Sequence, residues 1–543
     1  MSSLTVDRGV TVTMPDGIRL AADVYRPAGP GRHPVVLLRT PYDRGHAAAF
    51  GLQLNAVALA SAGYVAVIGD VRGRFGSEGE FDPFTGEAVD GVRTIEWAAE
   101  QPWSNGVVAM AGMSYCGYVQ VLAARERPDA LRAWIPAFCP VDVREDWIYD
   151  GDAFRLAFDL SLMVGTLAPM DARIADPTPF RAAFTDWDRT LQRPPDGHPE
   201  LAGTALGRHY RDWLERADDA GWWADRSGRG AGAHDAPVLV IGGWYDLFGH
   251  GTFALHEELQ QGPAAASLLV GPWDHSPLPL RSGSGDLDFG PAAAVDLPGT
   301  QLRWLDHVLR DGPSPLADAV RVFVTGLDRW LDLPAWPPEH RVETWHPSPD
   351  GRLAESAPSH ATTCGFAVDA ADPTPTVGGR LFARPTTFRA GPLDQSRRQA
   401  RPDVLAFDGP RVDRELLLAG PVRATIVSGS SSPTADIVLT LSDVRPDGRV
   451  LPIADGVRRR HGLGIDPAAF EVDLGHVAHA LRPGHRLRLD IAGASFPAID
   501  RQPPTGTARR TVVLGGATPS HLRLPVVTGG DGPPHHPNGA GTG

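Results

Sequence analysis

Residues 106–128 read GVVAMAGMSYCGYVQVLAARERP, and the character of the chain changes at Ser114. The residues before it, GVVAMA, have the composition of a buried strand, and those after it, YVQVLAAR, that of a buried helix. Because only a few residues join the two, the backbone must turn sharply at the serine. A serine on such a strand-to-helix turn holds strained backbone angles and exposes its hydroxyl above the sheet. The stretch therefore predicts a nucleophile at Ser114.

The match to the G-x-S-x-G pattern of such turns is imperfect. Gly112 is present, but Cys116 stands where the second glycine is usual, and Gly117 follows it. On the motif alone, an ordinary serine turn stays an alternative. Cys116 is itself a candidate nucleophile, but its place on the inner side of the turn favours a spacing role.

The sequence around this turn alternates strand-like and helix-like segments. Apolar runs such as PVVLLRT (34–40) and YVAVIGDV (64–71) end in polar or glycine-rich residues, and helix-like segments separate them. This rhythm is typical of buried parallel strands with crossover helices. The stretch VTVTMPDGIRLAADVYRP (10–27) predicts an added hairpin that turns at Asp16-Gly17.

The pattern divides the chain into five parts. Residues 1–137 and 236–340 carry the α/β pattern, and 138–235 read as helices joined by polar loops, so we expect a helical cap inserted into one α/β body. Short strands with glycine and proline turns over 341–527 predict an all-β jelly-roll domain. Residues 528–543, rich in glycine and proline, predict a disordered tail.

Two further residues follow strand-like runs in the second α/β part. Asp246 follows VLVIGGWY, and His275 follows SLLVGPWD. A histidine would take the serine proton as general base, and a carboxylate would orient the imidazole and stabilise its charged form. Serine, acid and histidine in this chain order are typical of one hydrolase fold. Asp246 as a helix cap is the alternative for that residue alone.

Two groups are candidates to stabilise the oxyanion that such chemistry creates. The Tyr115 N–H lies at the first turn of the expected helix and gains from the helix dipole. The loop RTPYDRG (39–45) lacks a His-Gly-Gly motif, and the Tyr42 phenol is a substitute donor there. A tyrosine packed in a loop is the alternative for Tyr42.

Composition excludes several classes of protein. The chain has 51 basic and 65 acidic side chains, a net charge of −14, and no lysine at all, which argues against nucleic acid as a partner and removes Schiff-base and P-loop chemistry. No metal-binding motif and no nucleotide-binding glycine pattern occurs, so we expect no metal and no cofactor. Three scattered cysteines and the absence of an apolar run of roughly 20 residues predict a cytoplasmic protein without a membrane span.

At these residues the sequence resembles the cocaine-esterase-type α/β-hydrolases, which are related to X-prolyl dipeptidyl-peptidases and α-amino-acid ester hydrolases. The similar segments include RTPYDRG (39–45), DVRGRFGSEGEFDPF (70–84), TIEWAAEQPWSNGVVAMAGMSYCGY (94–118), GGWYDLF (242–248), GPWDHS (271–276) and RPGHRLRLDIAGASFP (482–497). The resemblance implies an α/β-hydrolase body, an inserted cap and a C-terminal jelly roll. It also implies Ser114, Asp246 and His275 as a catalytic triad, Tyr42 and Tyr115 as oxyanion donors, and a homodimer.

We therefore expect a serine hydrolase that cleaves small-molecule carboxylic esters through an acyl-enzyme. The acyl group is expected to be small, with an aromatic acyl group as one of the candidates, and Phe248 and Trp147 are the expected substrate contacts. An X-prolyl dipeptidyl-peptidase, or an amidase or acylase, on the same triad is the alternative, and acidic cap residues such as Asp146 and Asp150 would then bind an ammonium group. A non-catalytic sugar- or partner-binding protein is a third hypothesis, which the ordered triad disfavours.

Overall fold

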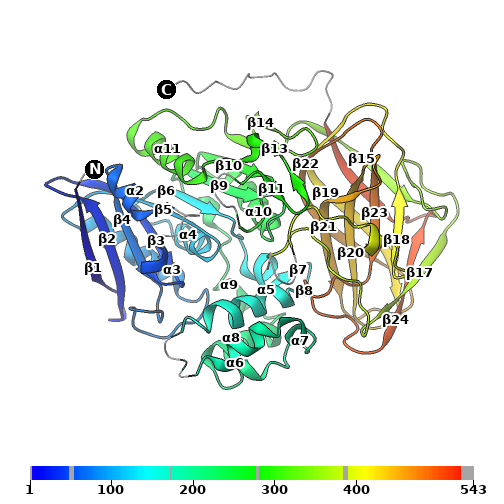
Figure 1. Ribbon diagram of the computed structural model, residues 1–543, viewed down its shortest axis with the longest axis horizontal. Helices are drawn as coiled ribbons and strands as arrows, with labels where there is room; N and C mark the ends of the chain where they lie inside the picture. The colour runs from blue at the N-terminus through cyan, green and yellow to red at the C-terminus, as the bar shows by residue number, and fades with distance from the viewer. Residues whose placement is uncertain are drawn as a thin grey trace.

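The computed structural model describes residues 3–47, 54–171, 174, 176–276, 281–382 and 389–527. An α/β body and an all-β domain lie at opposite ends of the molecule, and a cap of helices lies between and below them (Figure 1). The predicted tail, residues 528–543, lies outside the described residues.

The body is built on a ten-stranded sheet whose central strands are parallel and buried. In space the strands follow the order β1 (Leu4–Thr13), β2 (Arg19–Pro27), β4 (Val65–Asp70), β3 (His33–Thr40), β5 (Ser104–Met113), β6 (Leu131–Ala137), β9 (Val238–Gly243), β10 (Ala266–Gly271), β13 (Val320–Val324) and β14 (Arg329–Leu333). β1 and β2 pair antiparallel with Val12 opposite Leu20, which confirms the predicted hairpin. From β4 to β13 every neighbouring pair is parallel.

Helices cover both faces of this sheet because its strands are apolar on both sides. One face packs against α3 (Glu87–Glu100), α4 (Tyr115–Arg125) and α10 (Gly249–Gln260), and the other against α2 (Ala56–Ser61) and α11 (Leu297–Arg310). β5, β9 and β10 run in the same direction, so the residues after them meet at one edge of the sheet. Among the described residues, no helix combines the length and the apolar character needed to cross a membrane.

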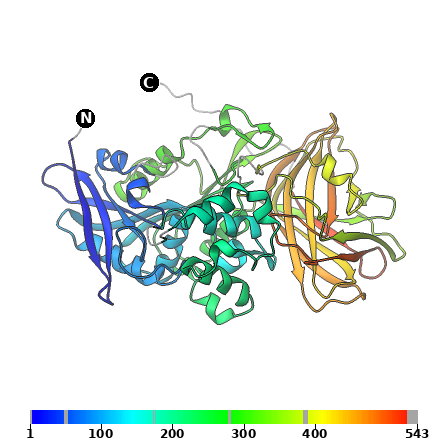
Figure 2. The same cartoon turned by 60° about the horizontal axis from the view of Figure 1, so that its bottom comes forward.

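The cap comprises the segments between β6 and β9, and in Figure 2 it faces the viewer between the body and the all-β domain. Its helical segments are η1 (Arg144–Ile148), α5 (Leu156–Leu160), η2 (Ser161–Leu167), α6 (Thr178–Thr185), α7 (Trp187–Leu191), η3 (Pro199–Leu201), α8 (Ala205–Glu215), α9 (Ala220–Ala224) and η4 (Ala231–Ala233). η1 and η2 are π-helical. Two two-residue strands, β7 (Tyr149–Asp150) and β8 (Ala153–Phe154), form a small hairpin in a part of the chain where the sequence indicates only helices.

The C-terminal domain packs two antiparallel sheets face to face around its own apolar core. The larger sheet contains β15 (His340–Pro347), β16 (Leu353–Ala354), β17 (Thr362–Asp369), β19 (Leu416–Ser430), β22 (Ala468–Leu481), β24 (Thr507–Leu514) and β25 (His521–Val527). The smaller contains β18 (Val404–Asp408), β20 (Ala435–Val444), β21 (Val450–Arg460) and β23 (Arg486–Ala492). Backbone hydrogen bonds join this domain to the body, since the Thr325 N–H donates to the Ala478 carbonyl at 3.0 Å and the Ala480 N–H to the Thr325 carbonyl at 2.9 Å.

Candidate active site

Ser114 occupies the sharp turn between β5 and α4. Its φ of 58° and ψ of −127° are strained values for a residue with a side chain. The Ser114 N–H donates to the Ala137 carbonyl at the end of the neighbouring strand, at 2.9 Å. This bond ties the turn to β6, so the serine stays at the edge of the sheet.

The residues around the turn explain why it has this sequence. Gly112 has a φ of 153°, and a Cβ there would lie 2.7 Å from the Cβ of Cys116. A Cβ at Gly117 would lie 2.9 Å from the Ala137 carbonyl oxygen. The helix and strand therefore approach too closely for side chains at these two positions. Gln120, fully buried, adds a brace that sequence reasoning missed, because its amide nitrogen donates to the carbonyls of Gly112, Cys116 and Ile135 at 2.9–3.2 Å.

Three predicted residues are brought into a hydrogen-bonded series. His275 Nε2 lies 3.1 Å from Ser114 Oγ, and His275 Nδ1 lies 2.6 Å from Asp246 Oδ1. Asp246 has no exposed surface, and His275 is 6% exposed. In this geometry the imidazole can take the serine proton at Nε2 while the carboxylate holds the Nδ1 proton.

The two predicted oxyanion donors lie close to Ser114. Tyr42 follows β3 and contacts the same cavity as Ser114. Burial raises the pKa of its phenol well above the ordinary value, although the nearby Arg74 charge and a hydrogen bond with the Ser114 side chain lower it. The phenol therefore keeps its proton near neutral pH and remains a donor.

Only the backbone of Tyr115 is placed to serve as the predicted oxyanion donor. Its hydroxyl points away from Ser114, donates to Glu87 Oε1 at 2.9 Å and accepts from the Phe84 N–H at 3.1 Å. Its N–H belongs to the first turn of α4, where N–H groups lack intrahelical partners. That N–H is therefore available beside the serine.

Ser114 and His275 open into a cavity of about 310 Å³ with a mainly apolar wall. The wall contains Thr40, Tyr42, His46, Met113, Trp147, Phe158, Leu162, Thr166, Met170, Ser276 and Phe382. Trp147, a predicted substrate contact, is part of this wall. Phe248, the other, lies one layer behind, because its fully buried ring packs against Trp147 at 4.7 Å and His275 at 5.2 Å between ring centroids.

Sequence reasoning missed most of the distal wall. The Phe382 ring centroid lies 5.7 Å from that of His275, although Phe382 belongs to the all-β domain, in the segment between β17 and β18. Leu162, Thr166 and Met170 come from the cap. No local motif marks these positions, since only the packing of distant segments brings them to Ser114.

The acidic cap residues that could bind an ammonium group lie elsewhere. Asp150 pairs with Arg155 at 3.1 Å, and Asp152 with Arg144 at 3.0 Å. Asp146 is buried and accepts the Asp142 N–H at 3.2 Å. Among the described residues that line the catalytic cavity, none is Asp or Glu. The sequences of segments 48–53, 172–173, 277–280 and 383–388, which lie outside the described residues, contain no Asp or Glu either.

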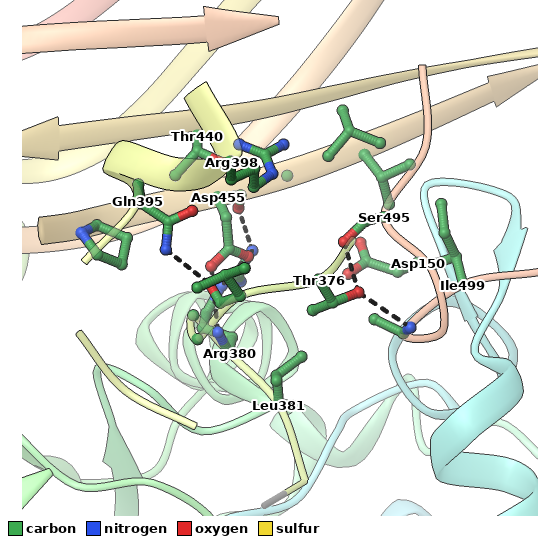
Figure 3. A pocket seen from close by; sticks show the side chains of 18 residues that line it. Asp150, Thr376, Arg380, Leu381, Gln395, Arg398, Thr440, Asp455, Ser495 and Ile499 are labelled. Carbon is green, nitrogen blue, oxygen red and sulfur yellow. Dashed lines mark hydrogen bonds and ion pairs between the residues drawn. The ribbon is translucent and has the colours of Figure 1, made fainter. Parts of the chain in front are cut away.

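A second, polar cavity of about 70 Å³ lies where the cap meets the all-β domain (Figure 3). The Arg380 guanidinium donates to Asp455 Oδ1 at 3.0–3.1 Å along this wall, and the Thr376 and Ser495 hydroxyls lie 2.9 Å apart. Asp150 reaches it from the cap. Over the described ranges of the chain, no group of three or more His, Cys, Asp and Glu side chains is arranged to hold a metal ion.

Comparison with known proteins places this site in a family. Residues 16–277 match the model of the X-Pro dipeptidyl-peptidase (S15) family, and residues 316–523 that of the X-Pro dipeptidyl-peptidase C-terminal non-catalytic domain. Cocaine esterase from Rhodococcus sp. (strain MB1 Bresler) is 31% identical over 96% of this chain and 99% of its own.

Solved structures share the whole architecture. An aminopeptidase from a marine sediment Thaumarchaeota archaeon and an α-amino acid ester hydrolase each superpose with a TM-score of 0.83, at 23% identity, over 97% of both chains. The fold thus accommodates both esterases and peptidases. Since the relative with the higher identity is an esterase aligned over nearly its entire length, this chain belongs to the X-Pro dipeptidyl-peptidase (S15) family as a cocaine-esterase-type carboxylic ester hydrolase.

Proposed function

We propose that this hydrolase cleaves esters of neutral, apolar acyl groups through an acyl-enzyme on Ser114. The observation that carries the proposal is the hydrogen-bonded series Ser114–His275–Asp246 at the floor of an apolar cavity. Ser114 Oγ attacks the ester carbonyl carbon while His275 Nε2 takes its proton. Asp246 holds the Nδ1 proton and stabilises the imidazolium.

The carbonyl oxygen becomes negative as the new C–O bond forms. The Tyr42 hydroxyl and the Tyr115 N–H are the donors assigned to it, and both are fixed by the fold before substrate binds. The intermediate then expels the alcohol, which takes the proton from His275. Water enters, gives its proton to His275 and attacks the acyl-enzyme, and Ser114 recovers its proton as the acid leaves.

The cavity wall supports a neutral acyl group. Trp147, Phe158 and Phe382 present aromatic surface, and no carboxylate lies among the described lining residues. A buried ammonium group would need such a carboxylate to offset its lost hydration. This difference favours the esterase over the alternative X-prolyl dipeptidyl-peptidase.

Two measurements test the proposal. A fluorophosphonate probe should label the wild type at Ser114, and Ser114→Ala should neither label nor hydrolyse esters, with kcat lower by several orders of magnitude, about 10⁴-fold or more. The wild type should also hydrolyse an aryl ester of a neutral aromatic acid far faster than an X-prolyl anilide. Faster cleavage of the anilide would reverse the assignment, and labelling that persists in Ser114→Ala would remove Ser114 from it.

A further inference from the structure

One buried arginine near the site has no role in the mechanism described so far. Arg74 belongs to RGRFGSEG (72–79), the loop that follows β4, and only 1% of its surface is exposed. β4 lies next to β3, so this loop lies beside the loop that carries Tyr42. A buried charge is costly unless hydrogen bonds and an opposite charge compensate it.

The Arg74 guanidinium donates hydrogen bonds to two separate parts of the chain, the Tyr42 loop and the cap. Its Nε donates to the Pro41 carbonyl at 3.0 Å, and one terminal nitrogen donates to the Leu167 carbonyl at 3.2 Å. The other terminal nitrogen lies 3.7 Å from the Asp171 carboxylate. The rings of Phe75 and Phe81 lie 5.1 and 5.2 Å from the guanidinium carbon.

The first contact fixes the loop of Tyr42. Pro41 immediately precedes Tyr42, and the Tyr42 N–H donates to Thr40 Oγ1 at 3.0 Å. The Arg74 charge lowers the pKa of the Tyr42 phenol, against the larger effect of burial. A cation that favours negative charge on the phenol oxygen also favours negative charge on an oxyanion bound to that phenol.

The second contact reaches the acyl cavity. Leu167 ends η2, and Leu162 and Thr166 from the same segment form part of the cavity wall. One guanidinium therefore connects the loop of the oxyanion donor with the wall of the acyl cavity. Lysine is a poorer substitute, because its single ammonium group does not reproduce the planar fork that binds two carbonyls at once.

We propose that Arg74 is a positioning residue for the oxyanion. Arg74 orients the Tyr42 hydroxyl through its hydrogen bond to the Pro41 carbonyl, and its hydrogen bond to the Leu167 carbonyl links the Tyr42 loop to the cap wall. The inference rests on the proposed function, since it assigns Tyr42 as an oxyanion donor. It predicts that Arg74 acts on the tetrahedral state rather than on ground-state binding.

The test is a double-mutant cycle between Arg74→Met and Tyr42→Phe. Loss of an oxyanion donor should cost Tyr42→Phe about 100- to 1,000-fold in kcat. Arg74→Met alone should lower kcat by about tenfold, with KM changed less than about threefold, and should weaken a phenylboronic acid inhibitor by a similar factor. In the Tyr42→Phe background, Arg74→Met should cost less than about twofold, because the residue through which it acts is gone. Arg74→Lys should restore part of the activity.

Arg510→Met serves as the matched control. Arg510 is also 1% exposed, but it lies in β24 of the all-β domain, so its loss should change thermal stability without changing kcat. Equal losses from Arg74→Met in both backgrounds would overturn the inference, as would an equal loss of kcat in Arg510→Met. If Arg74→Met does not fold, the same cycle with Arg74→Lys decides the question. Failure of Ser114 labelling in the wild type would instead refute the proposed function, so the two failures are distinguishable.

Discussion

The turn at Ser114 combines a strained serine with two glycines that leave no room for side chains. Strain of this kind persists only where the surroundings fix the backbone. Here the Ala137 carbonyl and the Gln120 amide hold the turn from the side of β6. The hydroxyl is therefore directed at His275 before substrate arrives, which lowers the entropy cost of reaching the reactive geometry.

Replacement of Gly112 by alanine should disrupt this turn. The new Cβ would lie 2.7 Å from the Cys116 Cβ and 2.9 Å from the Cys116 carbonyl oxygen. The alanine would also have to adopt the φ of 153° that Gly112 has. We expect a lower melting temperature, and a fall in kcat that is larger in fold terms than the change in KM. Gly106→Ala is the control, since Gly106 also has a positive φ, of 89°, but nothing lies within 4 Å of its added Cβ. It should cost roughly 1 kcal/mol with full activity, and similar behaviour of the two variants in thermal melts and ester assays would contradict the steric argument.

At the scale of elements, the two π-helical segments of the cap form part of the cavity at Ser114. η1 carries Trp147, and η2 carries Leu162 and Thr166. A π turn inserts an extra residue and rotates the side chains after it, and such turns concentrate at functional sites. This rotation has no signature in a 3.6-residue periodicity, so the sequence predicted helices over 138–235 but not which faces they present.

η1 also carries a buried acid that should make stability depend on pH. Burial and the neighbouring Asp142 charge raise the pKa of Asp146 to about 7, whereas an unfolded aspartate titrates near about 4. Between these values the folded state binds more protons than the unfolded state, so the free energy of unfolding should fall as pH rises from about 4 to about 7.

Asp146→Asn should flatten this dependence, because an amide keeps the acceptor for the Asp142 N–H without titrating. Denaturant unfolding at pH 5, 6, 7 and 8 measures the pH dependence of the free energy of unfolding. Asp188→Asn, which changes an exposed aspartate in α7 of the same cap, should leave the slope as in the wild type. A slope that is unchanged in Asp146→Asn would show that Asp146 does not titrate in this range.

At the scale of the whole molecule, three parts of the chain surround one cavity. The body supplies Ser114 and Tyr42, the cap supplies Trp147 and Phe158, and the all-β domain supplies Phe382 from the segment between β17 and β18. The Arg155 guanidinium from the cap also donates to the Leu247 carbonyl, directly after Asp246, at 2.9 Å. The parts should therefore depend on one another for stability as well as for shape.

The Arg380–Asp455 pair in Figure 3 joins the segment that carries Phe382 to β21 within the all-β domain, and it offers a test of how firmly that segment is held. Arg380→Met leaves the Asp455 carboxylate without its main partner and should destabilise the protein by up to ~3 kcal/mol, less than for a fully buried pair because Asp455 is partly exposed. Arg380→Met/Asp455→Leu should recover part of the loss. The exposed pair Arg389–Asp286 is the control, and Arg389→Ala should cost less than about 1 kcal/mol in thermal or denaturant unfolding. Equal losses of stability for the two single variants would contradict a structural role for the Arg380–Asp455 pair.

The sequence predicted those features that depend on local order along the chain. Ser114, Asp246 and His275 each follow an apolar strand, so their meeting at one sheet edge could be inferred from the parallel arrangement. Phe382 could not be inferred, because its approach to His275 depends on how two domains pack. The position of Phe248 behind His275 likewise depends on the turn between β9 and α10, which leaves the ring buried. Side chains set by neighbouring strands were thus accessible to sequence reasoning, and those set by domain packing were not.

The Phe382 ring beside His275 has a consequence for protein engineering. The C-terminal region matches a family model described as non-catalytic, yet its segment between β17 and β18 contributes a wall next to His275. A chimaera that exchanges this region between relatives would therefore also acquire a different cavity wall and, with it, a different substrate selectivity. Mutant libraries intended to change the selectivity of the enzyme should include the segment between β17 and β18 along with the loops around Ser114.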